Sequence, residues 1–169
     1  YQGCMNAAVD VDLSNGNWYS VYDYLDGSDW DLLVITGGCL DTNGDGYLDY
    51  FQDFIMGDAE NTTYPAIGAQ DDYVMIVAQT NEFGSEDIIC YYSDDDGQTW
   101  NVSKERIDLP MRGAEEPSMV ELKDGTIMTV LRTGLGTIYK AYSHDRGQTW
   151  SQPESTGLAA PQATHLLKR

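Results

Sequence analysis

The sequence predicts an all-β protein made of antiparallel β-propeller blades. An eight-residue pattern, Ser-x-Asp-x-Gly-Gln-Thr-Trp, stands at 93–100 and returns at 143–150, fifty residues later. Runs with the composition of first strands begin near residues 4, 64, 116 and 163. No segment has the hydrophobic period of a helix. A repeat of roughly 40–50 residues that holds three or four strands is typical of a propeller blade.

The first predicted blade spans residues 1–63. A loosely alternating run at 4–12 ends at a Ser-Asn-Gly-Asn turn. The aromatic and β-branched residues at 18–25 suit a pleated surface, and the apolar segment 31–36 predicts a third strand. An acidic loop that contains glycine follows at 41–49.

The second predicted blade spans residues 64–110. Strand-like runs at 64–70 and 73–79 are separated by two aspartates. A third run at 88–93 leads into the first copy of the repeated pattern. Aspartate and glycine between apolar runs are typical of the tight turns that join antiparallel strands.

The third predicted blade spans residues 111–160. Its runs at 119–122 and 127–131 flank Asp124-Gly125, and an Asp-Gly pair between two strand-like runs is a strong hairpin signal. A third run at 137–142 leads into the second copy of the pattern. Because one blade cannot bury both faces of its sheet, neighbouring blades must stack on it.

Composition and charge exclude several classes of protein. The net charge is −19, and residues 1–103 contain no lysine or arginine. Such an acidic chain repels a phosphate backbone, which argues against a nucleic-acid partner. No apolar run reaches the ~18 residues of a transmembrane segment. The cysteines, Cys4, Cys39 and Cys90, form no CxxC pair, and their spacing leaves open whether Cys4 and Cys39 form a disulfide.

The chain is expected to be an internal piece of a longer protein. It starts at Tyr1 rather than at methionine and stops at Arg169, shortly after the predicted start of a further blade near 163. About three blades are predicted, fewer than the roughly four to eight that close a propeller.

The repeated pattern resembles the Asp-box, or BNR, repeat of sialidases and related propellers. The stretch 115–161 also resembles a central blade of the exo-sialidases. The resemblance implies a six-bladed propeller with its active site at the mouth of the channel. It implies that the parent protein is a glycoside hydrolase that removes terminal sialic acid from glycans, outside the cell or on its surface. The pattern itself is expected to be scaffold, because serine and aspartate in such turns bond the backbone of the turn.

The resemblance points to Glu116 and Arg132 as the chemically important pair. In exo-sialidases a glutamate that opens the first strand of a blade lies sixteen positions before an arginine that closes the second, and these two residues match. Carried over, Glu116 is the general base that deprotonates a tyrosine nucleophile, and Arg132 binds the carboxylate of sialic acid. Glu115 competes for the role of base, but the interval and the following Pro117 favour Glu116.

The residue types suit this chemistry. A guanidinium can bind a carboxylate through two parallel hydrogen bonds. A phenol, with a reference pKa of about 10, is a poor nucleophile until a base takes its proton. Sialidases are the exception among glycosidases that uses a tyrosine nucleophile.

The connection at Asp124-Gly125 decides whether Glu116 and Arg132 share a face. A three-residue loop with a glycine bulge sets them opposite each other on one face. A two-residue loop sets them on opposite faces, because side chains alternate along a strand. The sequence leaves both loops open, and it also leaves open that the two residues form only a structural ion pair.

Other parts of the family's machinery lie elsewhere. The family needs two more arginines, an aspartate acid/base and the tyrosine nucleophile. No arginine precedes Arg106, and the tyrosine and the last arginine would lie beyond Arg169. These 169 residues alone are therefore expected to be inactive. The alternatives are a non-catalytic Asp-box propeller for carbohydrate binding or adhesion, and an enzyme acting on another anionic sugar; each alternative has a glycan partner.

The loop 41–49 resembles a calcium-binding loop. Oxygen-bearing residues stand at positions 1, 3, 5 and 9, with glycine at position 6, as in an EF-hand loop. The candidate ligands are Asp41, Asn43, Asp45 and Asp49. Position 12 is Gln52 rather than the usual glutamate, so a metal-free turn is the alternative. The reaction itself requires no cofactor.

Overall fold

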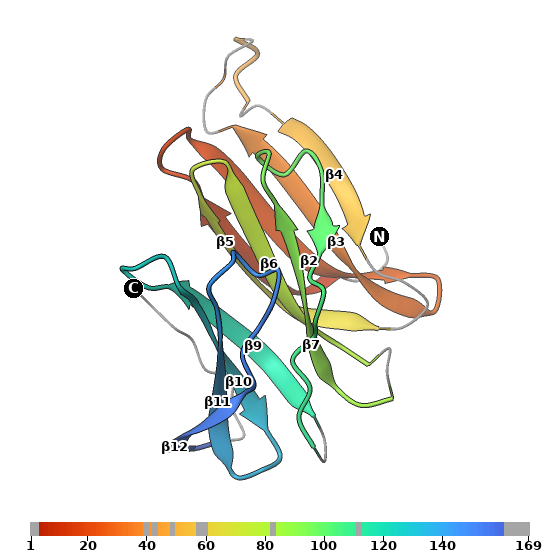
Figure 1. Cartoon of the computed structure of the whole chain (residues 1–169). Coiled ribbons are helices and arrows are strands. Elements are labelled where there is room, and N and C mark those ends of the chain that lie inside the picture. The colour runs from red at the N-terminus through yellow and green to blue at the C-terminus, as the bar shows by residue number, and fades with distance from the viewer. Residues whose placement is uncertain are drawn as a thin grey trace.

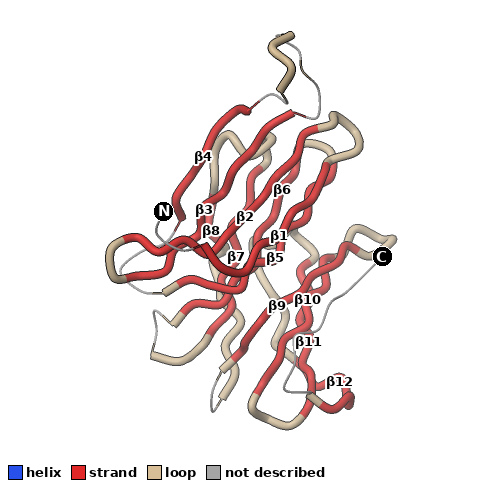
Figure 2. The backbone as a smooth tube through the Cα atoms, turned by 180° about the vertical axis from the view of Figure 1, so that it is seen from behind, coloured by secondary structure: helices blue, strands red, loops and turns tan. Residues whose placement is uncertain are grey.

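The computed structural model describes residues 4–38, 41, 44–47, 50–56, 61–81, 84–110 and 113–160. Within these ranges the chain forms three four-stranded antiparallel sheets and no helix. Each sheet is a simple meander in chain order (Figure 1). Figure 2 shows the same sheets from behind. The predicted all-β blade architecture is confirmed.

The first sheet has a long loop before its outer strand. Its strands are β1 Cys4–Val11, β2 Asn17–Asp26, β3 Asp29–Gly38 and β4 Tyr50–Met56. The first three match the runs predicted from the sequence. β4 was not among the predicted strands, although its aromatic and apolar residues have the composition of a strand.

The second and third sheets are built alike. The second consists of β5 Thr62–Gln70, β6 Tyr73–Thr80, β7 Asp87–Ser93 and β8 Asn101–Val102. The third consists of β9 Ala114–Glu121, β10 Ile127–Thr133, β11 Thr137–Ser143 and β12 Glu154–Ala159. The predicted strand near 163 lies outside the described residues.

First strands of successive sheets lie side by side. β1 contacts β5, and β5 contacts β9. The sheets therefore radiate from a common inner edge, as propeller blades do, and side chains at equivalent positions of β1, β5 and β9 line that edge.

The continuous apolar sequence of β6 reflects burial on both of its faces. Ile76 and Ala78 pack into a cluster with the first sheet, namely with Val21, Leu32, Val34 and Met56. Met75 and Val77 point the other way, into a cluster that includes Leu131, Ala141 and Trp150 of the third blade. Alternating residues of this one strand therefore join all three blades.

The repeated eight-residue turns are held by their own side chains. In the second copy, Ser143 Oγ accepts a hydrogen bond from Gly147 N at 2.7 Å, and Asp145 Oδ1 accepts one from Thr149 N at 2.9 Å. Asp145 Oδ2 also accepts a bond from Thr149 Oγ1 at 2.6 Å. The first copy repeats these contacts at 93–99. The serine and the aspartate thus bond within the turn, as scaffold residues do.

Alanine at Gly147 is expected to destabilise the protein more than alanine at Gly136. Both glycines have positive φ, +79° and +87°, so either change costs about 1–2 kcal/mol of backbone strain. A Cβ at Gly147 would also lie 2.5 Å from Met75 Cε and 3.0 Å from Cys90 Sγ, whereas one at Gly136 meets nothing within 4 Å. Overpacking adds about 1–3 kcal/mol.

Denaturant unfolding of the two variants measures this difference. Equal losses of unfolding free energy for Gly147→Ala and Gly136→Ala would show that the close packing under the turn contributes nothing. The comparison is matched because both variants introduce the same side chain at a left-handed backbone position.

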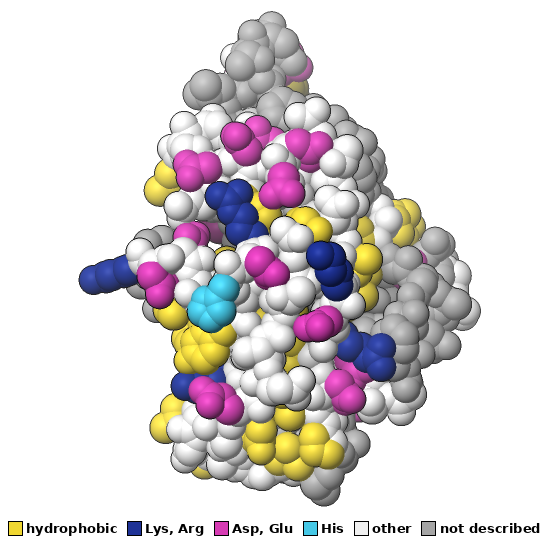
Figure 3. All heavy atoms as spheres, in the orientation of Figure 1, with side chains coloured by type: hydrophobic (Ala, Val, Ile, Leu, Met, Phe, Trp, Pro, Cys, Tyr) yellow, Lys and Arg dark blue, Asp and Glu magenta, His cyan; other side chains and the backbone are white. Residues whose placement is uncertain are grey.

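The surface agrees with the acidic composition. On the face shown in Figure 3, acidic side chains are scattered among single basic ones, and the basic side chains form no continuous patch. Among the described residues, no helix is long and apolar enough to cross a membrane.

Candidate functional site

Each first strand carries a bulge near its beginning. Asn6, Tyr64 and Glu116 have φ values of +31°, +52° and +46°, and the strand register shifts at each of them. Positive φ is uncommon for residues other than glycine, and such strain persists where the surrounding structure enforces it. Because the three first strands lie together, the three bulges mark one end of the inner edge.

Second strands place polar side chains beside these bulges. The register pairs Met5 with Asp23, Thr63 with Gln79, and Glu115 with Arg132, so the three second-strand residues are structural equivalents. Asp23 and Gln79 are hydrogen-bond acceptors, whereas an arginine side chain has only donors. The third blade therefore departs from the other two at this position by presenting a guanidinium, which binds acceptors such as a carboxylate.

The hairpin at Asp124-Gly125 has a three-residue loop. Leu122 N bonds Thr126 O at 2.8 Å, and Gly125 has φ +83°. This is the loop that sets Glu116 opposite Arg132. The strand bulge at Glu116 then shifts the register between β9 and β10 by one residue. As a result, Arg132 pairs with Glu115.

Both glutamates reach the guanidinium. Arg132 Nη2 lies 2.8 Å from Glu116 Oε1 and 2.5 Å from Glu115 Oε2. The side chains of Glu115 and Glu116 are 6% and 13% exposed, and that of Arg132 is 26% exposed. The hydrogen bond that Arg132 donates to the Glu116 carboxylate is the main reason why the pKa of Arg132 is raised. The guanidinium therefore stays charged beside two largely buried carboxylates.

The ion pair leaves hydrogen-bonding capacity unused. Glu116 Oε2 and Arg132 Nε are buried and have no hydrogen-bond partner among the described residues. An unpaired buried polar atom costs free energy. A ligand that brings both a proton and a carboxylate to this cluster would offer partners to both atoms.

A cavity of about 390 Å³ lies along the bulged ends of the first strands. Its lining includes Asn6, Tyr64, Glu116, Pro117, Ser118 and Met119. Arg132 is not among the lining residues. Tyr64 is 39% exposed, so an aromatic side chain lines the same cavity as Glu116.

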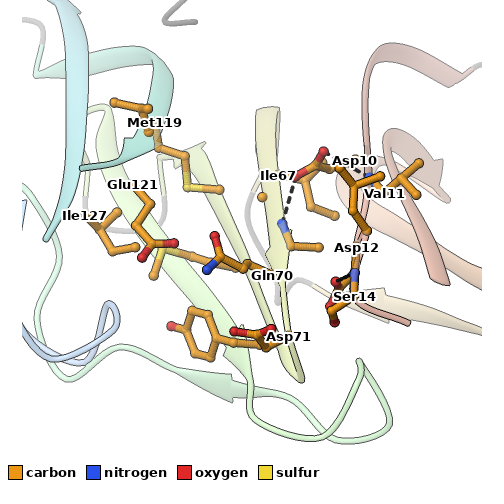
Figure 4. Close-up of a pocket in the computed structure, with 16 residues that line it drawn as sticks. Asp10, Val11, Asp12, Ser14, Ile67, Gln70, Asp71, Met119, Glu121 and Ile127 are labelled. Carbon is orange, nitrogen blue, oxygen red and sulfur yellow. Dashed lines mark hydrogen bonds between the residues drawn. The ribbon is translucent and has the colours of Figure 1, made fainter. Parts of the chain in front are cut away.

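A larger cavity of about 610 Å³ occupies the opposite end of the same inner edge (Figure 4). Its acidic lining residues are Asp10, Asp12, Asp71 and Glu121, and its apolar lining residues include Ile67 and Met119. Asp10 and Asp12 bond backbone amides, at Ala69 N and Ser14 N respectively. No cluster of three or more potential metal ligands occurs in the part of the chain that the structure describes.

Comparison with known proteins identifies the family. A model of the BNR repeat-like domain matches residues 59–168, more than half of the chain.

The chain belongs to the BNR repeat-like domain family.

The BNR repeat-like chain is similar to sialidases. It is 42% identical over 60 residues to the anhydrosialidase of Macrobdella decora, a match that covers 36% of this chain and 8% of the relative. The solved Trypanosoma rangeli sialidase matches 88% of the chain and 28% of its own length, with a TM-score of 0.62 and 21% identity. The NanB sialidase of Streptococcus pneumoniae matches 76% of the chain and 20% of its own length, with a TM-score of 0.54 and 26% identity.

These matches establish a sialidase-type propeller fold for the BNR repeat-like chain. The chain spans less than a third of the length of the relatives named here. The T. rangeli enzyme has also been solved in complex with sialic acid and as a covalent intermediate with a difluorosialic acid.

The predicted calcium loop is only partly described. Asp41 Oδ1 accepts bonds from Gly44 N at 2.6 Å and Asp45 N at 3.1 Å, and its Oδ2 accepts one from Gly46 N at 2.8 Å. Asp45 Oδ1 accepts a bond from Tyr47 N at 2.9 Å. The other candidate ligands, Asn43 and Asp49, lie outside the described residues, as does Cys39 of the considered disulfide.

Calcium remains a prediction with a direct thermal test. A ligand that binds only the folded state raises its melting temperature. At millimolar calcium, the melting temperature should rise for the wild-type protein and not for an Asp41→Asn variant, which loses one charge from the loop. An unchanged wild-type melting temperature would exclude the metal.

The sequence did not point to several residues at and beside the bulges, namely Asn6, Asp23, Tyr64 and Gln79. One signal was available for two of the bulges, because a proline follows both Tyr64 and Glu116. Proline cannot donate a ladder hydrogen bond, so it is found in strands mainly at edges and bulges.

Asp23 makes stability depend on pH. It is fully buried, and it accepts hydrogen bonds from Asn6 Nδ2 at 2.5 Å and Tyr64 N at 3.0 Å. Burial disfavours the charged carboxylate, whereas the two hydrogen bonds favour it. The effect of burial is larger, and it raises the pKa of Asp23 from 3.8 to about 6. The folded state then holds this proton more tightly than the unfolded state, so the stabilisation is complete below pH 3.8 and is lost as pH rises through about 6.

Asp23→Asn should flatten the decline of unfolding free energy between pH 4 and 6, measured by denaturant titration at each pH. Asp87 contributes in the same window, because burial also raises its pKa to about 6 although Arg106 Nε lies 2.7 Å away. The Asp23→Asn variant should therefore keep part of the slope. A slope identical to that of the wild type would contradict the assignment to Asp23.

Proposed function

We propose that this chain is part of an exo-sialidase-type glycoside hydrolase that releases terminal sialic acid from glycans. One observation carries the proposal: Glu116 stands on a strained bulge at the inner edge, with its carboxylate 2.8 Å from the guanidinium of Arg132. The relatives named above support it, because they are sialidases that share the blade fold.

Arg132 has the role of substrate binder in this proposal. A sialic acid presents a carboxylate, and a guanidinium can hold it through two hydrogen bonds. Both glutamates contact Nη2, whereas the buried Nε has no partner among the described residues and is a donor left for the substrate's carboxylate. The other arginines that the family uses belong to other parts of the protein.

Glu116 has the role of general base. It removes the proton of a tyrosine, whose phenolate then attacks the anomeric carbon while the aglycone leaves with a proton from an acid. A neutral tyrosine approaches an anionic sugar without the repulsion that a carboxylate nucleophile would meet. By resemblance, we place that tyrosine beyond Arg169.

The setting follows from the substrate. We propose that the parent protein acts outside the cell or at its surface, on sialylated glycans. Fractionation of the source cells, with detection of the full-length protein, would check its location.

The test is the release of sugar by the full-length protein. Incubation with sialylated and uronic-acid-bearing glycans, followed by chromatography of the released sugars, should yield a sialic acid or its anhydro form. Release of a uronic acid instead would assign a different anionic sugar. Binding of glycans without any release would assign a non-catalytic lectin-like propeller.

A further inference from the structure

We propose that Gln79 is a positioning residue that holds Glu116 in place from the neighbouring blade. Its side-chain oxygen Oε1 accepts a hydrogen bond from Glu116 N at 3.2 Å. This inference rests on the proposed role of Glu116 and adds a residue to which no function has been assigned.

The strand that carries Gln79 is well suited to hold a neighbour. β6 is paired on both sides, with Gln79 opposite Thr63 of β5 and Ile88 of β7. The adjacent residues Ala78 and Thr80 are 0% and 1% exposed. The backbone at Gln79 is therefore fixed by two ladders and by buried neighbours, and only its side chain crosses to the third blade.

The bulge at Glu116 needs such a partner. Its positive φ is a strained conformation that costs on the order of 1–3 kcal/mol. Pro117 has no N–H, so Glu116 N is the donor available between Glu115 and Ser118. That donor bonds Gln79, so a bond that holds the bulge comes from another blade.

The same arrangement occurs one blade earlier. Tyr64 also has positive φ and is also followed by proline, and its N–H bonds Asp23 Oδ1 at 3.0 Å. Gln79 and Asp23 occupy equivalent positions on their second strands. The recurrence shows that a bulge held across a blade boundary is a regular feature of this chain, and in the third blade it carries Glu116.

Full-length variants test the role of Gln79 in turnover. Gln79→Leu keeps the approximate volume and removes the acceptor, and it should lower kcat by about 10- to 100-fold through misplacement of Glu116. KM should change by less than about threefold, since Gln79 does not bind substrate. Gln70→Leu is the matched control, because Gln70 is exposed at the opposite end of the inner edge and should leave kcat unchanged.

Gln79→Glu separates positioning from general stability. It keeps an acceptor for Glu116 N, so kcat at its pH optimum should remain above that of Gln79→Leu. The added negative charge opposes ionisation of Glu116, so the acidic limb of the pH–rate profile should move to higher pH. A glutamine that contributed only to stability would leave kcat of the folded Gln79→Leu variant at the wild-type value.

Amide hydrogen exchange tests the contact without relying on activity. In Gln79→Leu the amide of Glu116 should exchange at least about tenfold faster than in the wild type, with the Tyr64 amide unchanged. Unchanged exchange at Glu116, or wild-type kcat and pH profile in an active enzyme, would overturn the proposal. If the wild-type protein releases no sialic acid, the proposed function fails, and exchange alone then decides whether Gln79 holds the bulge.

Discussion

Replacing Glu116 with glutamine in the full-length protein is expected to lower kcat for a sialoside by on the order of 10²- to 10⁴-fold. Glutamine keeps the size of the side chain and can still bond Arg132 through its carbonyl oxygen, but it cannot take a proton. The loss should therefore appear in kcat with little change in KM. Steady-state kinetics on a chromogenic sialoside measure both values, and circular dichroism checks that the fold is retained.

Glu115→Gln is the matched control for this prediction. Glu115 contacts the same guanidinium, at 2.5 Å, but its residue is only 4% exposed and it is not among the residues that line the cavity at the mouth. Its variant should keep a kcat well above that of Glu116→Gln. If Glu115→Gln were the more damaged variant, the assignment of the base would pass to Glu115.

Replacing Arg132 with alanine is expected to raise KM by on the order of 100-fold, because a charged hydrogen-bonded partner of the substrate is lost. The change also leaves the carboxylates of Glu115 and Glu116 facing each other without their cation. Removing one partner of a buried ion pair destabilises a protein, so the melting temperature should fall as well.

Arg132→Lys distinguishes the two effects. Lysine keeps the positive charge beside both glutamates but lacks the planar fork that binds a carboxylate in two places. Its melting temperature should lie close to that of the wild type while KM remains raised. Wild-type KM in Arg132→Lys, combined with low stability in Arg132→Ala, would mean that Arg132 serves only as a structural ion pair.

Local patterns predicted most of the scaffold. Asp124-Gly125 between two apolar runs predicted a hairpin, and the structure has one, because glycine supplies the positive φ that the loop requires. The repeated turns were predicted as scaffold for a similarly local reason, since Ser143 and Asp145 bond residues four positions away. Such contacts depend on neighbours in sequence and can be read without a fold.

The surroundings of Glu116 could not be predicted in the same way. The choice between loop lengths was open, and the register shift at the bulge, which brings Glu115 as well as Glu116 to Arg132, had no counterpart in the prediction. The contact from Gln79 crosses a blade boundary over 37 positions in sequence. No periodicity or motif encodes a contact of this kind.

From the sequence one could infer the type of element, the blade repeat, the Asp-box turns and, by resemblance, the pairing of Glu116 with Arg132. The first three follow from alternation, turn chemistry and the spacing of the repeat, whereas the pairing is what the resemblance to exo-sialidases implies. The folded structure was needed to show how the three inner strands align, why Glu116 is strained, and which side chain of the preceding blade holds it. Those features arise where blades meet, and they depend on packing between strands that are distant in the chain.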